Sequence, residues 1–465
     1  MTGVRPLFPV ASRPRDEVLE RMRTLRSRDA RWKDGRTFSL VYYAGEDVTS
    51  LLKDAYTMFF SENALNPMAF PSLKKLEAEV VAMTADLLGG DAEVAGNMTS
   101  GGSESLLMAV KTARDLARAE RPEVTNPEMV LPVTAHPALE KAAHYFGVTP
   151  VRIPVGPDCR ADVDAARAAV SDRTVLMVGS APAYPHGVID PIRELAGIAL
   201  ERGVLFHVDA CLGGFLLPFL RRLGHPVPDF DFSVPGVTSI SADVHKYGFA
   251  AKGASVILYR TATIRRHQFF TFTEWPGGLY GSPTMTGTRP GGAIAAAWAV
   301  INHLGEEGYL SLARTIMETT RTLVAGIEKV PGLRLVARPD MSVIAFTSDS
   351  FDVYRLADAM DARGWHLDRQ QRPPCLHLMV TPAHAPVADE FLKDLREAAL
   401  AVAGMEEEDG VQGLAAMYGA LGSLPDRGLV RDVIIGILED WTRPEPDTSS
   451  EAGARPTEGD ASEKA

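Results

Sequence analysis

The chain has 465 residues, a formal net charge of −12, and 46% hydrophobic and 23% charged residues. This is the composition of a globular protein, and the length suffices for two or three packed units. The net negative charge repels nucleic-acid phosphates and anionic membrane surfaces, and we find no basic patch that offsets it. We therefore expect no nucleic-acid partner.

Two apolar stretches, residues 203–220 and 290–300, have the hydropathy of membrane segments. The first contains His207 and Asp209, and the second is shorter than the roughly 20 apolar residues that cross a bilayer. We therefore expect no membrane-spanning segment, and the N-terminus has no apolar run of the kind found in signal peptides. The three cysteines are far apart and form no CxxC pair, which is typical of reduced thiols, so we expect a cytoplasmic protein.

The first part of the chain predicts an arm followed by an α/β sheet. Residues 1 to about 35 are rich in Arg and Pro, and apolar residues then recur at helical spacing over 73–87 until a glycine pair ends the pattern. Strand-like runs follow at 129–133, 174–178, 204–208, 239–242 and 255–259. Helical patterns at 103–119 and 191–202 separate several of these strands, and this alternation predicts a mostly parallel sheet.

After about residue 310 the pattern changes to that of a smaller α+β domain. We expect a long helix, then strands at 333–336, 343–346 and 376–380 and helices at 352–363 and 387–402. From residue 443 onward no large apolar residue occurs, which predicts a disordered acidic tail. We divide the chain into an N-terminal arm (1–65), a large domain (66–308), a small C-terminal domain (309–442) and the tail (443–465).

Several familiar catalytic motifs are absent from the sequence. It has no HExxH, no GxSxG and no GxGxxG after a strand, and the glycines at 248 and 253 are followed by Ala254 where a phosphate loop needs lysine. The eleven histidines are scattered without the spacing of metal ligands, so we predict no catalytic metal.

Four other features occur in chain order. The string TSGGSE at 99–104 opens a helix, where converging N–H groups suit a phosphate, although a glycine turn with a serine cap would look the same. His136 lies between a strand and a helix, and alone it indicates a capping or packed histidine. Asp209 ends an apolar strand, so its carboxylate needs a partner, which by itself suggests a salt bridge.

The fourth feature is Lys246, which follows His245 and is flanked by small and apolar residues. An isolated lysine is usually solvated, but these flanks favour a buried amine with a lowered pKa, as Schiff-base chemistry requires. Together the four features match pyridoxal 5'-phosphate. This cofactor needs a helix N-terminus for its phosphate, an acid for its pyridine nitrogen, a flat side chain over the ring and a lysine.

Five strings along the chain carry a resemblance to a known family: NALNPMAFPSLKKLEAEVV, TSGGSESLLMA, HVDACLGGFL, VTSISADVHKYGFAAKGAS and SPTMTGTRPGG. From about residue 37 to 438 the chain resembles the sphingosine-1-phosphate lyases, which belong to the pyridoxal-phosphate-dependent group II decarboxylase superfamily. The resemblance implies fold type I, the aspartate-aminotransferase-like α/β fold, with a large parallel-sheet domain and a small C-terminal α+β domain. It also implies a homodimer in which the N-terminal segment wraps around the partner and the active sites lie at the interface.

The resemblance also implies roles for individual residues. Lys246 would bind the cofactor covalently, Asp209 would pair with the pyridine nitrogen, and His136 would stack on the ring. The cofactor-binding set would be completed by Gly101, Gly102, Ser103, Asp243 and His245, with Thr286 and Gly287 reaching the phosphate from the neighbouring subunit.

For the substrate phosphate, the resemblance implies Tyr184, Lys252 and a mobile tyrosine, Tyr42, from the other subunit. Asn66 stands where the family has histidine in its NxLHPD string, and Met68 replaces the acidic residue of that string. Asparagine can donate a hydrogen bond but carries no charge, so phosphate affinity or substrate range is expected to differ.

The implied activity is retro-aldol cleavage of a phosphorylated long-chain base, such as sphingosine 1-phosphate, to a long-chain aldehyde and phosphoethanolamine, with Lys246 or Tyr42 transferring the proton. An amino-acid decarboxylase is the alternative enzyme. Asn66 favours this alternative, whereas Tyr184 and Lys252 oppose it. A non-catalytic binding homologue is a third interpretation, and the presence of both Lys246 and Asp209 argues against it.

Overall fold

The computed structural model describes residues 8–405 and 424–444, and the chain divides into two compact units. One unit comprises residues 1–30 and 419–465, with the helices α1 (Arg15–Arg26) and α14 (Arg427–Trp441). The other comprises residues 31–418 and holds the remaining elements described below. The predicted disordered tail lies outside the described residues from 445 onward.

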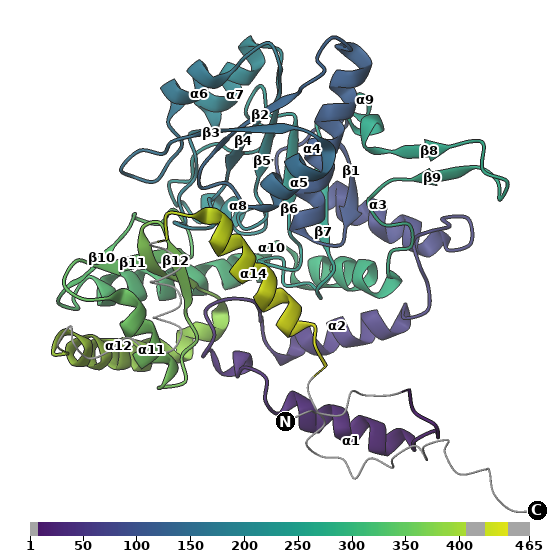
Figure 1. The fold of residues 1–465 in the computed structure, drawn as a ribbon. Coiled ribbons are helices and arrows are strands. Elements are labelled where there is room, and N and C mark those ends of the chain that lie inside the picture. Colours follow the sequence, from purple (N-terminus) through teal and green to yellow (C-terminus); the bar gives the residue numbers. More distant parts are fainter. Residues whose placement is uncertain (1–7, 406–423, 445–465) are drawn as a thin grey trace, which may run out of the picture. The chain divides into compact units, whose positions relative to one another are not determined.

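The larger unit is built on a seven-stranded sheet with the order β1-β7-β6-β5-β4-β2-β3 (Figure 1). Neighbouring strands from β3 to β6 are parallel, whereas β7 runs antiparallel to both β6 and β1. This mixed, mostly parallel sheet confirms the predicted α/β fold. The strands are β1 (Ala95–Thr99), β2 (Glu128–Pro132), β3 (Thr149–Ile153), β4 (Thr174–Ser180), β5 (Leu205–Asp209), β6 (Ser239–Ala242) and β7 (Ser255–Tyr259).

Helices precede and connect these strands. In chain order they are α2 (Glu46–Met58), α3 (Pro71–Leu87), α4 (Gly102–Glu120), α5 (Ala138–Phe146), α6 (Val163–Ala169), α7 (Ile192–Glu201), α8 (Leu217–Arg222) and α9 (Ala262–Arg265). Short 3-10 turns lie at Trp32–Asp34, Arg266–Gln268 and Pro382–Val387. The helices predicted at 73–87, 103–119 and 191–202 form with small shifts of their ends.

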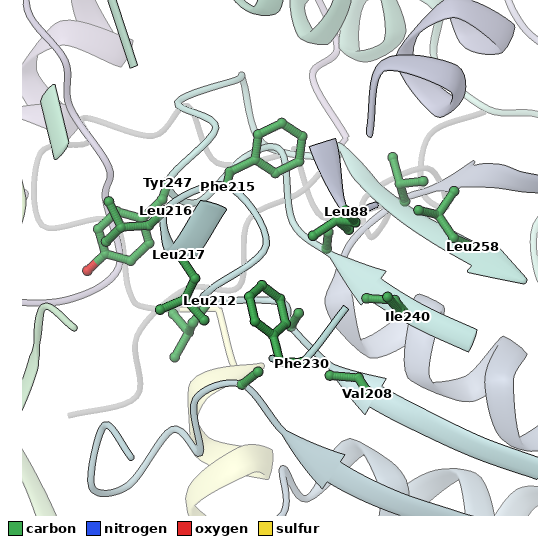
Figure 2. Packing of buried hydrophobic residues seen from close by; sticks show 14 of the residues in the cluster. Leu88, Val208, Leu212, Phe215, Leu216, Leu217, Phe230, Ile240, Tyr247 and Leu258 are labelled. Atoms are coloured by element: carbon green, nitrogen blue, oxygen red, sulfur yellow. The ribbon is translucent and has the colours of Figure 1, made fainter. Parts of the chain in front are cut away.

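The core of the sheet is a row of aliphatic side chains from neighbouring strands. Val208 of β5, Ile240 of β6 and Leu258 of β7 are fully buried, and Leu88 and Phe230 lie close to them (Figure 2). Each such side chain contributes about 1.5–3 kcal/mol to folding when it leaves water. This packing fixes β5 and β6 side by side, and therefore fixes the residues at their carboxyl ends.

The small sheet of the same unit is antiparallel, with the order β10-β11-β13-β12. Its strands are β10 (Leu333–Leu335), β11 (Val343–Ser348), β12 (Asp368–Gln371) and β13 (Pro374–Met379), and α11 (Val353–Asp361) and α12 (Ala388–Ala403) pack with it. The domain boundary near residue 308 stays a prediction. It falls within α10 (Gly291–Ile327), close to Gly305, where the backbone leaves the helical conformation.

The helix α10 differs from our expectation, because it begins at Gly291 and not near residue 310. Its first turns are the small-residue stretch at 291–297, which is buried where α10 packs against α2 and α3. A Cβ on Gly292 would lie 2.7 Å from the Tyr56 ring, so the absence of a side chain permits this close approach. Across the described ranges, no helix is both long enough and apolar enough to span a bilayer.

Three strands and a hairpin had no signal that we recognised. The strands β1 (AGNMT) and β12 (DRQQ) lack apolar alternation, and β3 contains a proline. They form because neighbouring strands offer them backbone partners, which a local pattern does not reveal. The hairpin of β8 (Phe270–Phe272) and β9 (Tyr280–Ser282) extends away from the large sheet (Figure 1).

The turn that contains Gly187 packs closely against β11, and this contact gives a test of the packing between the two sheets. Gly187 has φ +70°, and a Cβ there would collide with the backbone carbonyl of Val343 in β11. Gly147 has a similar φ of +65° but open space around it. Gly147→Ala should cost about 1–2 kcal/mol for the left-handed backbone alone. Gly187→Ala should cost about 3 kcal/mol or more, since overpacking adds to that strain.

Urea denaturation monitored by circular dichroism measures both variants against the parent chain. Equal shifts of the two midpoints would contradict the close approach of Gly187 to β11.

Candidate active site

The carboxyl ends of β5 and β6 meet the start of α4 around one cavity of about 420 Å³. Parallel strands place their carboxyl ends at one edge of a sheet, which is where ligands bind in open α/β folds. Asp209 is the last residue of β5, and Asp243 directly follows β6. The cavity is lined by Ser100, Gly101, Gly102, Ser103, Glu104, Leu106, His136, Pro182, Tyr184, Asp209, Cys211, Leu212, Asp243, His245 and Lys246.

The glycine segment before α4 forms one wall of the cavity. A Cβ on Gly102 would lie 2.7 Å from Asp243 Oδ2 and 2.9 Å from Cys211 Sγ, so only glycine fits there. Glu104 Oε2 accepts both the backbone N–H and the hydroxyl of Ser100 at 2.6 Å, and its Oε1 accepts the N–H of Met285 at 2.9 Å. The first N–H groups of α4 therefore face a small, fixed recess that suits a phosphate.

Asp209 is buried at 7% exposure and faces the cavity without a basic partner among the described residues. Its Oδ1 accepts the N–H of Cys211 at 3.1 Å and the hydroxyl of Ser241 at 3.5 Å. The salt bridge that Asp209 alone suggested is therefore not made by a protein side chain in these segments. A buried carboxylate in this setting fits a cationic ligand group.

Lys246 lies 3.0 Å from Asp243, measured from Nζ to Oδ2. Burial alone would lower the pKa of Lys246, but the negative charge of Asp243, with smaller contributions from Cys211, Tyr42 and Asp209, outweighs burial and raises it. Burial likewise acts to raise the pKa of Asp243, whereas the positive charge of Lys246 brings it below its usual value. Our expectation of a lowered lysine pKa is wrong for this chain, because the flanking residues do not show that Asp243, three positions earlier, lies against the amine.

The two cavity histidines each accept a backbone hydrogen bond. His136 Nδ1 accepts the N–H of Ala138 at 3.1 Å, so this residue supports the first turn of α5 and also lines the cavity. His245 Nδ1 accepts the N–H of Ala254 at 3.2 Å. Burial lowers the pKa of both rings, which favours neutral imidazoles.

Tyr184 lines the cavity where the two sheets approach each other. Its ring stacks on His377 with 4.5 Å between centroids, and its hydroxyl donates to Asp368 Oδ2 at 3.1 Å. Lys252 Nζ lies 5.3 Å from the centre of the Tyr42 ring, and desolvation together with the charge of Lys246 lowers the pKa of Lys252. Tyr184 thus belongs to the wall, whereas Lys252 does not line the cavity but interacts electrostatically with Lys246, which does.

Tyr42 lies beside its own chain's Lys252 and Tyr247, whereas the resemblance implied a tyrosine supplied by the other subunit. Its hydroxyl donates to Met379 Sδ at 3.1 Å, and burial, followed by Tyr247, raises its pKa well above the usual value. The adjacent Tyr43 instead donates to Glu46. Of the two neighbouring tyrosines, Tyr42 is therefore the one near the cavity.

Five predicted residues do not line this cavity: Tyr42 and Lys252, described above, and Asn66, Thr286 and Gly287. Asn66 is exposed, and its Oδ1 accepts the N–H groups of Met68 and Ala69, which closes a local turn. Thr286 lines a separate cavity of about 100 Å³ that also includes Ser100. Gly287 lines neither cavity, so the reach of Thr286 and Gly287 to a neighbouring cofactor stays a prediction.

Sequence reasoning included Ser100 and Glu104 in the string that suits a phosphate, but it gave neither an individual role, and it did not single out Cys211. A signal for two of them exists, because Cys211 is two residues after Asp209 and Glu104 is in the first turn of α4. Hydrogen bonds between distant segments, such as that from the Met285 N–H to Glu104, leave no local signal in the sequence.

Comparisons with known proteins match most of this chain. Residues 7–349 match the model of the pyridoxal-dependent decarboxylase conserved domain. A sphingosine-1-phosphate lyase of Oryza sativa subsp. japonica is 48% identical over 91% of this chain and 80% of its own length, and that of Rattus norvegicus is 43% identical over 93% and 76%. The structure of a sphingosine-1-phosphate lyase from Burkholderia pseudomallei K96243 has a TM-score of 0.86 and 41% identity, covering 95% of this chain and 98% of that one.

The chain belongs to the sphingosine-1-phosphate lyase family of pyridoxal-dependent decarboxylases. Its cofactor is pyridoxal 5'-phosphate, and the cavity fits this group. The glycine segment before α4 suits the phosphate, Asp209 lacks a cation among the described residues and suits a protonated ring nitrogen, and Lys246 supplies an amine in the same cavity. The family thus agrees with fold type I and with the cofactor expected from the sequence.

The ion pair between Asp243 and Lys246 predicts the effect of removing one charge. Because Asp243 raises the pKa of Lys246 while burial lowers it, Asp243→Asn should lower the pKa of Lys246. Reductive methylation of the cofactor-free protein at a series of pH values, read by peptide mass spectrometry, measures this shift. In the variant, the rise in the rate of Lys246 modification with increasing pH should begin at a lower pH than in the parent chain. Asp158→Asn, which changes a carboxylate outside the cavity, is the control. If the dependence of Lys246 modification on pH were the same in Asp243→Asn as in the parent chain, Asp243 would not be the group that raises the pKa of Lys246.

Proposed function

We propose that this enzyme cleaves sphingosine 1-phosphate, or a similar phosphorylated long-chain base, to a long-chain aldehyde and phosphoethanolamine. The observation that carries the proposal is one cavity that contains Lys246, Asp209 and Tyr184, with Lys252 close by. An amine and an acid serve the cofactor, and a hydroxyl and a cation suit a substrate phosphate. The names of the relatives support the same substrate class.

The bound cofactor supplies an electron sink for the cleavage of the carbon–carbon bond next to the substrate amine. We assign Lys246 to covalent attachment of the cofactor and Asp209 to keeping its ring nitrogen charged. His136 would stack on the ring, and the glycine segment with His245 would hold the phosphate. The neutral state that burial favours for His136 suits this role, because a second cation over the ring would repel the protonated ring nitrogen that Asp209 stabilises.

Substrate recognition would depend on Tyr184 and Lys252. The Tyr184 hydroxyl is held by Asp368 at the cavity wall, and the Lys252 amine lies on the neighbouring Tyr42 ring. A phosphate between them would accept a hydrogen bond from each. Asn66 has no part in this proposal, because its side chain is engaged in a turn outside the cavity.

The proton of the substrate hydroxyl must pass to a base on this chain. We favour Lys246 over Tyr42 for this step. Lys246 lines the cavity, whereas Tyr42 does not, and the Tyr42 hydroxyl is directed to Met379 Sδ.

Incubation of the purified holoenzyme with sphingosine 1-phosphate tests the function. We expect equal amounts of long-chain aldehyde and phosphoethanolamine, measured by mass spectrometry. Lys246→Ala should lower kcat by about 1000-fold or more, because both the covalent attachment and the proposed base are lost. Release of carbon dioxide from glutamate or aromatic amino acids, with no aldehyde from the lipid, would instead establish a decarboxylase.

We also propose that the enzyme is a homodimer in a reducing compartment such as the cytoplasm. The hairpin of β8 and β9 exposes Phe270, Phe272 and Trp275, and apolar patches of this kind suit a subunit contact. The cysteines Cys159, Cys211 and Cys375 are free and buried, which suits a reducing compartment.

Light scattering coupled to gel filtration tests the dimer. The parent chain should elute with the mass of two chains, and the double variant Phe272→Glu with Trp275→Glu should shift toward one chain, because buried charge opposes association. Tyr145→Glu, which changes another exposed aromatic residue on α5, should stay dimeric. A monomeric parent chain would contradict the proposal.

A further inference from the structure

A chain of buried polar side chains extends from Asp209 into the sheet, away from the cavity. Ser241 of β6 lies next to Asp209, and its Oγ is 3.5 Å from Asp209 Oδ1. His207 of β5 lies beyond it, with Nε2 3.2 Å from Ser241 Oγ and Nδ1 2.9 Å from Ser239 Oγ. His207 and Ser241 are both 0% exposed, so water does not reach these atoms.

The donors and acceptors of this chain can be arranged in one consistent order. Burial lowers the pKa of His207 to about 4, so at neutral pH the ring has one N–H and one lone pair. The carboxylate of Asp209 can only accept, and therefore Ser241 must give it the hydroxyl proton. Ser241 Oγ then accepts from His207 Nε2–H and from the thiol of Cys211, whose Sγ is 3.3 Å away. His207 Nδ1 is left to accept the hydroxyl proton of Ser239.

The reverse order is unfavourable. If Ser241 donated to His207, its oxygen lone pair would face the Asp209 carboxylate in a buried site, and the carboxylate would lose one of its donors. His207 would then need its proton on Nδ1. The position of one proton on His207 therefore reports whether the chain supports Asp209.

We propose that His207 and Ser241 are positioning residues that hold the Asp209 carboxylate directed at the cofactor's ring nitrogen. They do not touch the cofactor or the substrate, because neither lines the cavity. The arrangement has a simple physical purpose. An acid that keeps a ring nitrogen protonated must remain charged in a dry site, and donors behind it stabilise that charge without competing for the oxygen that faces the cofactor.

The proposal depends on the cofactor and not on the reaction. It holds whether the enzyme cleaves a lipid phosphate or decarboxylates an amino acid, so its failure and the failure of the lyase assignment are separate results.

Two spectroscopic and binding measurements on the holoenzyme test the proposal. With ¹⁵N-labelled pyridoxal phosphate, the ring-nitrogen resonance of Ser241→Ala should move toward the unprotonated position. The dissociation constant for the cofactor should rise about tenfold, the loss expected for one hydrogen bond to a charged group. His207→Leu should change both readouts in the same direction, because Ser241 then loses the donor that fixes its orientation.

Thr238→Val is the matched control. Thr238 also bridges β5 and β6, since its Oγ1 contacts the backbone N–H and carbonyl of Phe206 at 2.9 Å, but it does not contact Asp209. Loss of this hydroxyl should leave the ring-nitrogen resonance unchanged. If Ser241→Ala and Thr238→Val gave the same resonance and the same cofactor affinity, the proposal would be overturned.

A neutron structure of the parent holoenzyme tests the proton order without any substitution, which covers the case of a variant that does not fold. A proton on His207 Nε2 and none on Nδ1 supports the proposal. A proton on Nδ1 alone overturns it.

Discussion

The active site depends on two carboxylates that are buried at the ends of neighbouring strands, Asp209 after β5 and Asp243 after β6. A buried charge is costly unless it is paired, and the chain treats the two acids differently. Asp243 has its cation in Lys246, 3.0 Å away. Asp209 has only hydrogen-bond donors among the described residues, from Cys211 and Ser241. The site is therefore electrostatically incomplete at Asp209, which is where a cationic ring would complete it.

The difference between the surroundings of Asp209 and those of Asp243 follows from the packing of the sheet. The core packing of Val208, Ile240 and Leu258 holds β5, β6 and β7 together, and α4 starts beside their ends. Gly102, the first residue of α4, then allows the helix N-terminus to approach Asp243 and Cys211 more closely than any side chain would permit. The recess for the phosphate, the acid Asp209 and the amine of Lys246 thus result from one packing arrangement.

Much of this arrangement could be predicted from local signals. The strands β5 and β7 are short apolar runs, the residues at 99–104 open a predicted helix, Asp209 ends β5, and Lys246 lies between β6 and β7. The raised pKa of Lys246 could not be predicted, because the distance from Asp243 to the amine depends on the turn after β6. The start of α10 was missed because alanine and glycine give no amphipathic pattern when a helix is buried on several sides. Likewise, the place of Tyr42 in its own chain rests on contacts with residues more than two hundred positions away, which only the tertiary fold reveals.

The central claim is that Lys246, among the lysines of this chain, holds the cofactor in the cavity formed by β5, β6 and α4. Borohydride reduction of the holoenzyme, followed by proteolysis and mass spectrometry, locates the covalently attached cofactor most directly. The account predicts a single modified peptide with pyridoxal phosphate on Lys246. Attachment to Lys252, or to a lysine outside the cavity, would contradict it.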